Sequence, residues 1–154
     1  MNPNDDSVTI LVLLLHAGST LMMTGLIWFV QIVHYPLMSR VGESSFAKYE
    51  SAHTRSTTWV VGPLMLIELV TAVYLLGFAP TQQAHWVALL GLIALGFIWG
   101  STLMLQIPAH RRLERGFDQS IHRELVQTNW VRTIAWSIRS ILAMWLLVPA
   151  GVIQ

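Results

Sequence analysis

The segment 8–33 contains no Asp, Glu, Lys or Arg, and this long apolar stretch constrains the fold more than any other feature of the sequence. A helix that crosses the hydrocarbon core of a bilayer needs about 20 mostly apolar residues. Three further segments, 59–78, 86–107 and 129–153, are also long and apolar. We therefore predict an all-α fold, in which residues 1–154 form a single transmembrane domain built as a four-helix bundle.

The composition supports a membrane protein and excludes several other classes. Only 11% of the residues are charged, whereas soluble domains carry about 25%. The chain has no cysteine, which excludes a disulfide scaffold, thiolate metal sites and cysteine nucleophiles. The formal net charge is only +1, so no basic surface is expected and nucleic acid is not an expected partner.

The basic residues predict the orientation of the four spans. All nine lie between spans one and two, or between spans three and four and in the start of the fourth: Arg40, Lys48, Arg55, Arg111, Arg112, Arg115, Arg123, Arg132 and Arg139. The positive-inside rule then places both termini outside and both long connections in the cytoplasm. Asp5 and Asp6 precede the first apolar segment where a signal peptide would carry basic residues, so we expect this segment to be a retained span.

Two features outside the spans predict further contacts. In the connection 44–58, Phe46, Tyr49 and His53 recur at roughly helical spacing, which predicts a helix that lies at the membrane interface between spans one and two. In the third span, Gly96 and Gly100 form a small-xxx-small pair, which allows close helix packing either within one bundle or between the chains of a homo-oligomer.

Glu68 is the one acidic residue in the four predicted spans. It lies nine residues after Trp59, or about 14 Å along a helix, close to the middle of the membrane. A buried carboxylate there must be neutral, paired or metal-bound, so Glu68 is a candidate catalytic base and metal ligand. Arg139 reaches a similar depth in the fourth span. The alternatives are therefore a structural Glu68–Arg139 ion pair and a protonated Glu68 that is hydrogen-bonded to a neighbour.

Three histidines are expected at the same end of the bundle. His34 ends the first span, His53 precedes the second and His110 follows the third. Neutral imidazoles with a carboxylate are usual ligands for transition metals. We therefore consider His34, His53, His110 and Glu68 as a metal site and leave the cofactor open between iron, copper and zinc. The alternative is that each histidine caps a helix or lies at the interface.

Other polar side chains predict a binding surface for a substrate. Arg132, Trp136 and Arg139 recur at helical spacing on one face of the fourth span. Gln31 and Gln106 each lie one turn before a candidate histidine. The arginines would bind an anionic group or stabilise negative charge, and Trp136 would stack on a flat ring.

These residues resemble those of a family of small, uncharacterised bacterial four-span membrane proteins. The resemblance lies in Gln31, His34, Tyr35, Pro36, Phe46, Tyr49, His53, the segment 63–68, Gln106, Pro108, His110, Leu113, Gly116, Asp118 and the segments 128–133 and 136–139. This family is distantly similar to the anthrone-oxygenase-like family, which oxygenates polycyclic aromatic substrates without a well-established cofactor. The resemblance implies a bacterial inner membrane protein and transfers no catalytic residue.

Three functions are consistent with this pattern. The first is a membrane oxidoreductase or oxygenase that acts on a hydrophobic small molecule near the cytoplasmic leaflet. The second is a non-enzymatic binder or transporter that uses Glu68 as a proton site. The third is an accessory subunit of a larger membrane complex.

Overall fold

The computed structural model of the chain describes residues 3–79 and 81–148, which fold as helices without strands. The helices are α1 (Pro3–Phe29), η1 (Val30–His34), α2 (Tyr35–Met38), α3 (Glu43–Gly77), α4 (Gln82–Ser101), η2 (Thr102–Gln106), α5 (Ile107–Leu113) and α6 (Gln119–Leu147). Because α1, η1 and α2 follow one another without a break, as do α4, η2 and α5, the described chain forms four rods. The predicted all-α, four-helix architecture is confirmed.

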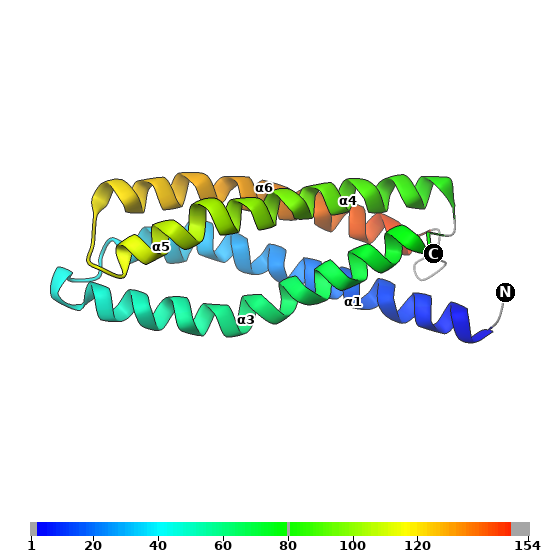
Figure 1. Cartoon of the computed structure of the whole chain (residues 1–154), viewed down its shortest axis with the longest axis horizontal. Coiled ribbons are helices and arrows are strands. Elements are labelled where there is room, and N and C mark those ends of the chain that lie inside the picture. Colours follow the sequence, from blue (N-terminus) through cyan, green and yellow to red (C-terminus); the bar gives the residue numbers. More distant parts are fainter. Residues whose placement is uncertain (1–2, 80, 149–154) are drawn as a thin grey trace.

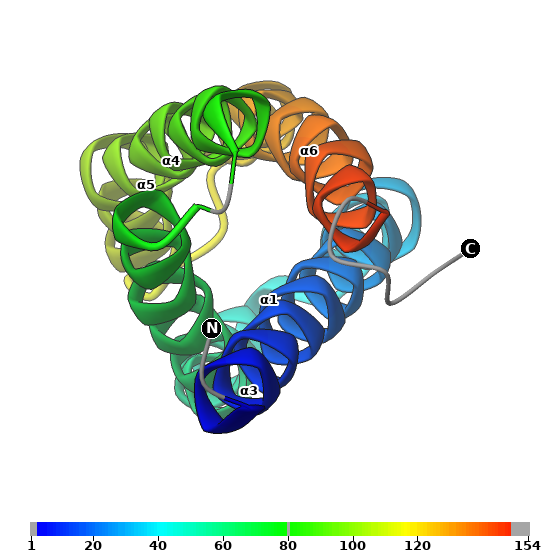
Figure 2. The same cartoon turned by 90° about the vertical axis from the view of Figure 1, so that its right-hand side faces the viewer.

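The four rods form an elongated antiparallel bundle. The start of α1, the end of α6 and the α3–α4 connection lie at one end, and the turns 39–42 and 114–118 lie at the other (Figure 1). Viewed from the end, the rods follow one another around the bundle in the order α1, α3, α4 and α6 (Figure 2). Every rod therefore packs on two neighbours, and the candidate site residues near the two turns are brought to one end.

The helix bounds differ from the predicted spans in two places. The segment 44–58 is not a separate helix, because α3 runs continuously from Glu43 to Gly77 and includes Pro63. No glycine or proline interrupts this segment before Gly62, so nothing in it ends the helix. The predicted interfacial helix is thus the first part of α3. The predicted fourth span extends to residue 153, and its last residues, 149–153, lie outside the described part of the chain.

The bundle consists of two helix hairpins, α1–α3 and α4–α6. The first rod of each hairpin contains one π-helical segment, which ends two residues before a proline. The N–H of Tyr35 donates to the carbonyl of Val30, and the N–H of Ile107 donates to that of Thr102, so each bond spans five residues. Pro36 and Pro108 follow immediately, and a proline ring clashes with the carbonyl four residues earlier. A widened turn relieves this clash and lets both helices continue past the proline.

The outer surface of the bundle is apolar along much of its length. Three helical stretches, Ser7–Met38, Glu43–Gly77 and Gln82–Leu113, are long and apolar enough to cross a membrane. The helix α6 is not in this set, since Arg132 and Arg139 lower its hydropathy, but both arginines are buried inside the bundle. Its outer face is apolar too, and Ile141 is 71% exposed.

Gly96 and Gly100 lie on the outer side of α4 and do not pack within the bundle. Apart from the neighbouring residues and backbone of the same helix, no described atom lies within 4 Å of the position that a Cβ would take at either glycine. Together with Phe97 and Met104 they line a shallow groove on the outside of the helix. The structure therefore does not support packing of these two glycines inside one bundle, which was one of the two alternatives that the sequence left open.

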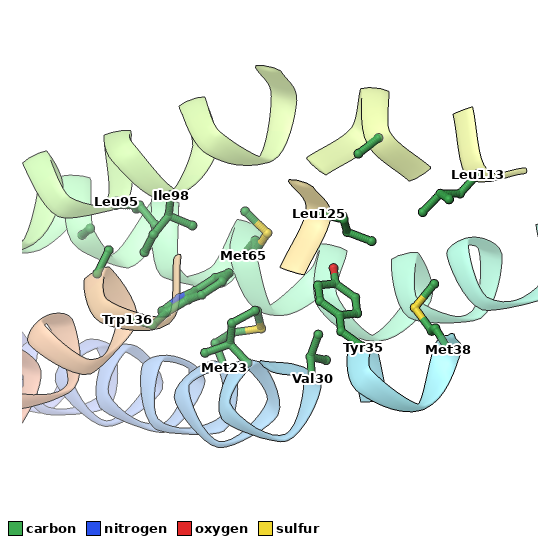
Figure 3. Packing of buried hydrophobic residues seen from close by; sticks show 14 of the residues in the cluster. Met23, Val30, Tyr35, Met38, Met65, Leu95, Ile98, Leu113, Leu125 and Trp136 are labelled. Carbon is green, nitrogen blue, oxygen red and sulfur yellow. The ribbon is translucent and has the colours of Figure 1, made fainter. Parts of the chain in front are cut away.

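The hydrophobic core surrounds the indole of Trp136. Figure 3 shows this ring between Met23 and Met65, with Leu95 and Ile98 contributed by α4. All five side chains are buried. This packing joins all four rods at the middle of the bundle and fixes the orientation of the indole N–H.

Asp118 caps the start of α6 and makes a testable contribution to stability. Its carboxylate accepts hydrogen bonds from the hydroxyl of Ser120 and from the N–H groups of Ile121 and Ser120, and these bonds hold the pKa of Asp118 below its usual range. Because the pKa is lower in the folded state, the stabilisation is complete above the unfolded pKa and is lost as pH falls through the folded pKa.

We expect the substitution Asp118→Asn to reduce the acid sensitivity of the protein. Asparagine is also a good N-cap, so the melting temperature at neutral pH should change little. On acidification below about pH 4, the variant should lose less stability than the wild type, because its cap does not titrate. Melting curves of the detergent-purified proteins at both pH values test this, and an equal acid-induced loss would contradict it.

Candidate functional site

Glu68 is fully buried in α3 and is held by two side chains of α6. Its Oε1 lies 3.4 Å from Nη2 of Arg139, and its Oε2 accepts a hydrogen bond of 3.0 Å from Nε1 of Trp136. Arg139 is 1% exposed and also donates to the carbonyl of Gly91 on α4. The predicted Glu68–Arg139 pair is present, and it connects three of the four rods.

The same arrangement separates Glu68 from the three candidate histidines. His53 lies fifteen residues earlier on the same continuous helix, which is about 22 Å. Both oxygens of Glu68 are already engaged by Trp136 and Arg139. The structure therefore does not bring Glu68 together with His34, His53 and His110 as the predicted metal site requires.

The three histidines do meet, and their carboxylate partner is Glu50. The rings of His34 and His53 stack with centroids 4.4 Å apart, and His53 and His110 have centroids 5.5 Å apart. Nδ1 of His110 is hydrogen-bonded to Oε1 of Glu50, which is fully buried. The widened turn η1 carries His34, α3 carries Glu50 and His53, and α5 carries His110.

This histidine cluster does not have the geometry of a metal centre. A ring nitrogen binds metal through a lone pair in the ring plane, whereas the rings of His34 and His53 meet face to face, with an angle of 28° between their planes. The nitrogens of His110 are engaged by Glu50 and Tyr35. Within residues 3–79 and 81–148, no group of three or more His, Asp or Glu side chains could hold an ion. The predicted ligands of iron, copper or zinc are thus not arranged to bind one.

A chain of hydrogen bonds continues from His110 into the bundle. Nε2 of His110 lies 3.1 Å from the hydroxyl of Tyr35, and Nη2 of Arg132 donates to the same hydroxyl oxygen over 3.4 Å. Arg132 donates through Nε and Nη2 to Oδ1 of Asn129. The amide of Asn129 in turn donates to Oε1 of Gln31 over 2.8 Å. Two helix hairpins are therefore connected by one buried polar network.

Arg132 is a buried cation that forms no ion pair within residues 3–79 and 81–148. It is 8% exposed, and its acceptors are the amide oxygen of Asn129 and the hydroxyls of Tyr35 and Thr102. No ion pair joins it to a carboxylate in the described part of the chain. Burial of an unpaired charge is costly, so this guanidinium provides a strong attraction for a negative group that enters its surroundings.

A cavity of about 440 Å³ lies beside this guanidinium, among all four rods. Its walls are largely apolar, and its polar lining is concentrated towards the end of the bundle where the turns lie: Tyr35, His53, Thr54, Thr57, Thr58, Thr102, Gln106, His110, Arg111, Glu114 and Arg132. The cavity reaches the surface between α3 and the α4–α5 rod, where the lining residues Thr58, Leu103 and Arg111 are exposed. This shape suits a hydrophobic molecule that carries one polar group.

The remaining predicted binding residues have different places. Trp136 lines the cavity with its ring, and Gln106 lines it while donating to Thr128. Gln31 is buried in the polar network and is not among the lining residues. Arg139 is also absent from this lining, since it is bound to Glu68. Only part of the predicted binding surface therefore faces the cavity.

Sequence reasoning did not single out Glu50 or Tyr35 as site residues. For Glu50 a signal existed, because Glu50 and His53 form a Glu-x-x-His sequence, which places both side chains on one helix face. Tyr35 lies beside His34 in the segment that ends the first rod, but no spacing rule places its hydroxyl against His110. That contact depends on the widened turn η1 and on the packing of two hairpins.

No family model, curated protein or solved structure matches the chain. The resemblance to a bacterial four-span family and, more distantly, to anthrone-oxygenase-like proteins therefore stays a prediction based on the residues quoted above.

Proposed function

We propose that the chain is an integral membrane protein that binds a hydrophobic substrate in its cavity and acts on it as an oxidoreductase or oxygenase. The observation that carries the proposal is the position of Arg132, a buried cation that has no acidic partner among the described residues and lies beside an apolar cavity. Such a cation favours a substrate that is acidic or that becomes negative during reaction.

The exterior of the bundle supports a membrane location. Large apolar side chains face outward on all four rods, and Met22, Trp59, Met104 and Ile141 are each more than 60% exposed. In water such a surface would aggregate, whereas in lipid it is the expected exterior. We propose a bacterial inner membrane, with both termini outside and the turns 39–42 and 114–118 on the cytoplasmic side. The outward position of Gly96 and Gly100 supports association of two or more copies.

The proposed chemistry begins with removal of a proton from the substrate. Arg132 would stabilise the resulting anion. The imidazoles of His53 and His110 would accept and donate protons. Trp136 would form a flat wall of the cavity. The anion of a phenol or of an enolisable ketone gives up electrons more readily than its neutral form. For an aromatic ketone such as anthrone, reaction with dioxygen would yield anthraquinone and water.

The proposal is tested by filling the cavity. Val61 lines it, whereas Val60 is 53% exposed on the outside of the same helix. We expect Val61→Trp to abolish the binding of anthrone and its conversion to anthraquinone, since the larger side chain occupies the space for the ring. The matched variant Val60→Trp should behave as the wild type. Quenching of tryptophan fluorescence measures binding, and absorbance measures the product under air.

The outcomes separate the candidate functions. If Val61→Trp loses the conversion of anthrone and Val60→Trp retains it, the result supports an oxidoreductase. Metal analysis of the same preparation measures whether an ion is bound. Binding without conversion would favour a non-enzymatic binder or transporter. Equal behaviour of the two variants would overturn the proposed cavity site and leave an accessory subunit as the better hypothesis.

A further inference from the structure

Tyr35 occupies a position between a cation and a carboxylate–imidazole pair. Its hydroxyl receives a hydrogen bond from Nη2 of Arg132 over 3.4 Å and lies 3.1 Å from Nε2 of His110. His110 is bonded through Nδ1 to Glu50, which is fully buried. Tyr35 also lines the cavity. Figure 3 shows its ring extending from α2 into the bundle, with the hydroxyl oxygen at the far end.

The donors and acceptors along this chain define one direction for the hydrogen bonds. When Glu50 is ionised and His110 is neutral, the carboxylate can only accept, so Nδ1 of His110 carries the hydrogen and Nε2 carries the lone pair. Arg132 can only donate, so the oxygen of Tyr35 accepts from it. The hydroxyl hydrogen of Tyr35 is then left to be donated to Nε2 of His110.

Transfer of that hydrogen would place each new charge beside an opposite one. If the proton of Tyr35 moves to Nε2 of His110, the phenolate lies against Arg132 and the imidazolium lies against Glu50. Oppositely charged neighbours within hydrogen-bond distance favour the charged forms of both groups and so oppose the effect of burial, which favours the neutral forms. This compensation at both ends distinguishes Tyr35 from the chain's other tyrosines, Tyr49 and Tyr74, since no arginine bond is seen at either in the described structure.

The backbone around Tyr35 keeps its hydroxyl in place. Its carbonyl oxygen lies 2.8 Å from Nε2 of His122 on α6, and its N–H closes the widened turn η1 by bonding to Val30. The side chain is 2% exposed. Tyr35 is therefore held in place at both its backbone and its hydroxyl, as a catalytic acid or base must be.

We propose that Tyr35 is the group that takes a proton from a hydrophobic acid in the cavity, with His110 as the final acceptor. The O–H or activated C–H bond of the ligand breaks and a new O–H bond forms on Tyr35. The original O–H bond of Tyr35 breaks, and Nε2 of His110 gains that proton. The ligand anion stays beside Arg132, so the step moves one proton inside the protein and needs no oxidant. This inference rests on the proposed cavity site.

The test uses 2-naphthol, a hydrophobic acid whose anion has its own absorption band, and naphthalene, which has the same rings and no acidic hydrogen. In the full-length protein in mild detergent at neutral pH, we expect wild type to bind 2-naphthol as the anion. Tyr35→Phe should bind it in the neutral form, with the anion band lost. Tyr49→Phe is the matched control and should retain the band.

Two further measurements keep the proposal open to refutation. Glu50→Gln keeps Tyr35 and removes the negative charge beside His110. The anion band of 2-naphthol should therefore weaken, while the binding of naphthalene should not change. This variant replaces Tyr35→Phe in the test if Tyr35→Phe does not fold. A purely structural Tyr35 would alter the melting temperature and leave the band intact.

Three results would count against these ideas in different ways. An anion band that persists in Tyr35→Phe would overturn the role of Tyr35. Binding of neutral 2-naphthol by the wild type would overturn proton transfer but leave the cavity site standing. Failure of both 2-naphthol and naphthalene to bind would overturn the cavity site and, with it, the proposed function.

Discussion

The substitution Arg139→Gln is expected to lower the free energy of unfolding by about 3–5 kcal/mol, because it leaves the fully buried carboxylate of Glu68 without its cation. The variant Glu68→Gln should be similarly destabilised, since Arg139 then keeps only the carbonyl of Gly91 as a partner. In the double variant the two neutral amides can hydrogen-bond to each other, so part of the stability should return. Equilibrium unfolding in mixed detergent micelles measures all three.

The control for this cycle is an arginine in the solvent-exposed part of α3. Arg55 is exposed, so Arg55→Gln should change stability by a few tenths of a kcal/mol at most. If the losses from Glu68→Gln and Arg139→Gln simply add in the double variant, the two side chains are not energetically coupled and the pair is refuted.

A second large effect is expected at Asn129, which is fully buried between Arg132 and Gln31. Asn129→Leu removes the best acceptor of a buried guanidinium and leaves Oε1 of Gln31 with only the long hydrogen bond of 3.5 Å from the hydroxyl of Thr133. We expect a loss of about 3 kcal/mol or more in the free energy of unfolding. Unfolding of the purified variant in mixed micelles measures this loss.

The companion variant Asn129→Asp separates stability from ligand binding. The new carboxylate gives Arg132 an internal counter-ion, which offsets the loss of the N–H that Asn129 donates to Gln31, so the fold should be retained. The anion 2-naphthoate should then bind at least about tenfold more weakly, because the positive charge of Arg132 beside the cavity is now paired with a carboxylate of the protein. Binding of uncharged naphthalene should not change. Equal 2-naphthoate affinity in wild type and Asn129→Asp would show that Arg132 does not attract the ligand.

The helices and the central ion pair were accessible from the sequence because both follow from distances along the chain. Long apolar segments predict helices of membrane-spanning length. The depth of Glu68 and Arg139 within such helices follows from the rise of 1.5 Å per residue, which is why the pair could be foreseen. The helix ends were less predictable, since the segment 44–58 is polar enough to suggest a separate element and yet contains no residue that ends α3.

The histidine cluster could be predicted only in part. The approach of His34, His53 and His110 follows from topology, because each lies near a turn at the same end of the bundle. Their carboxylate was misassigned to Glu68, since depth along a helix does not show which acidic side chain on α3 faces the cluster. Glu50 and the hydroxyl of Tyr35 meet His110 through packing between hairpins, and a single sequence carries no direct record of such contacts.

The widened turns at Val30–His34 and Thr102–Gln106 shift the angular phase of the helices that follow them. In a regular α-helix each residue advances by about 100° around the axis, so a turn that holds one extra residue offsets every later side chain by about that angle. A helical wheel drawn from the apolar residues of α1 therefore assigns the wrong faces to His34 and Tyr35. Deleting one residue from either turn would swing an entire polar segment away from the interior, while leaving the apolar half of the same rod in register.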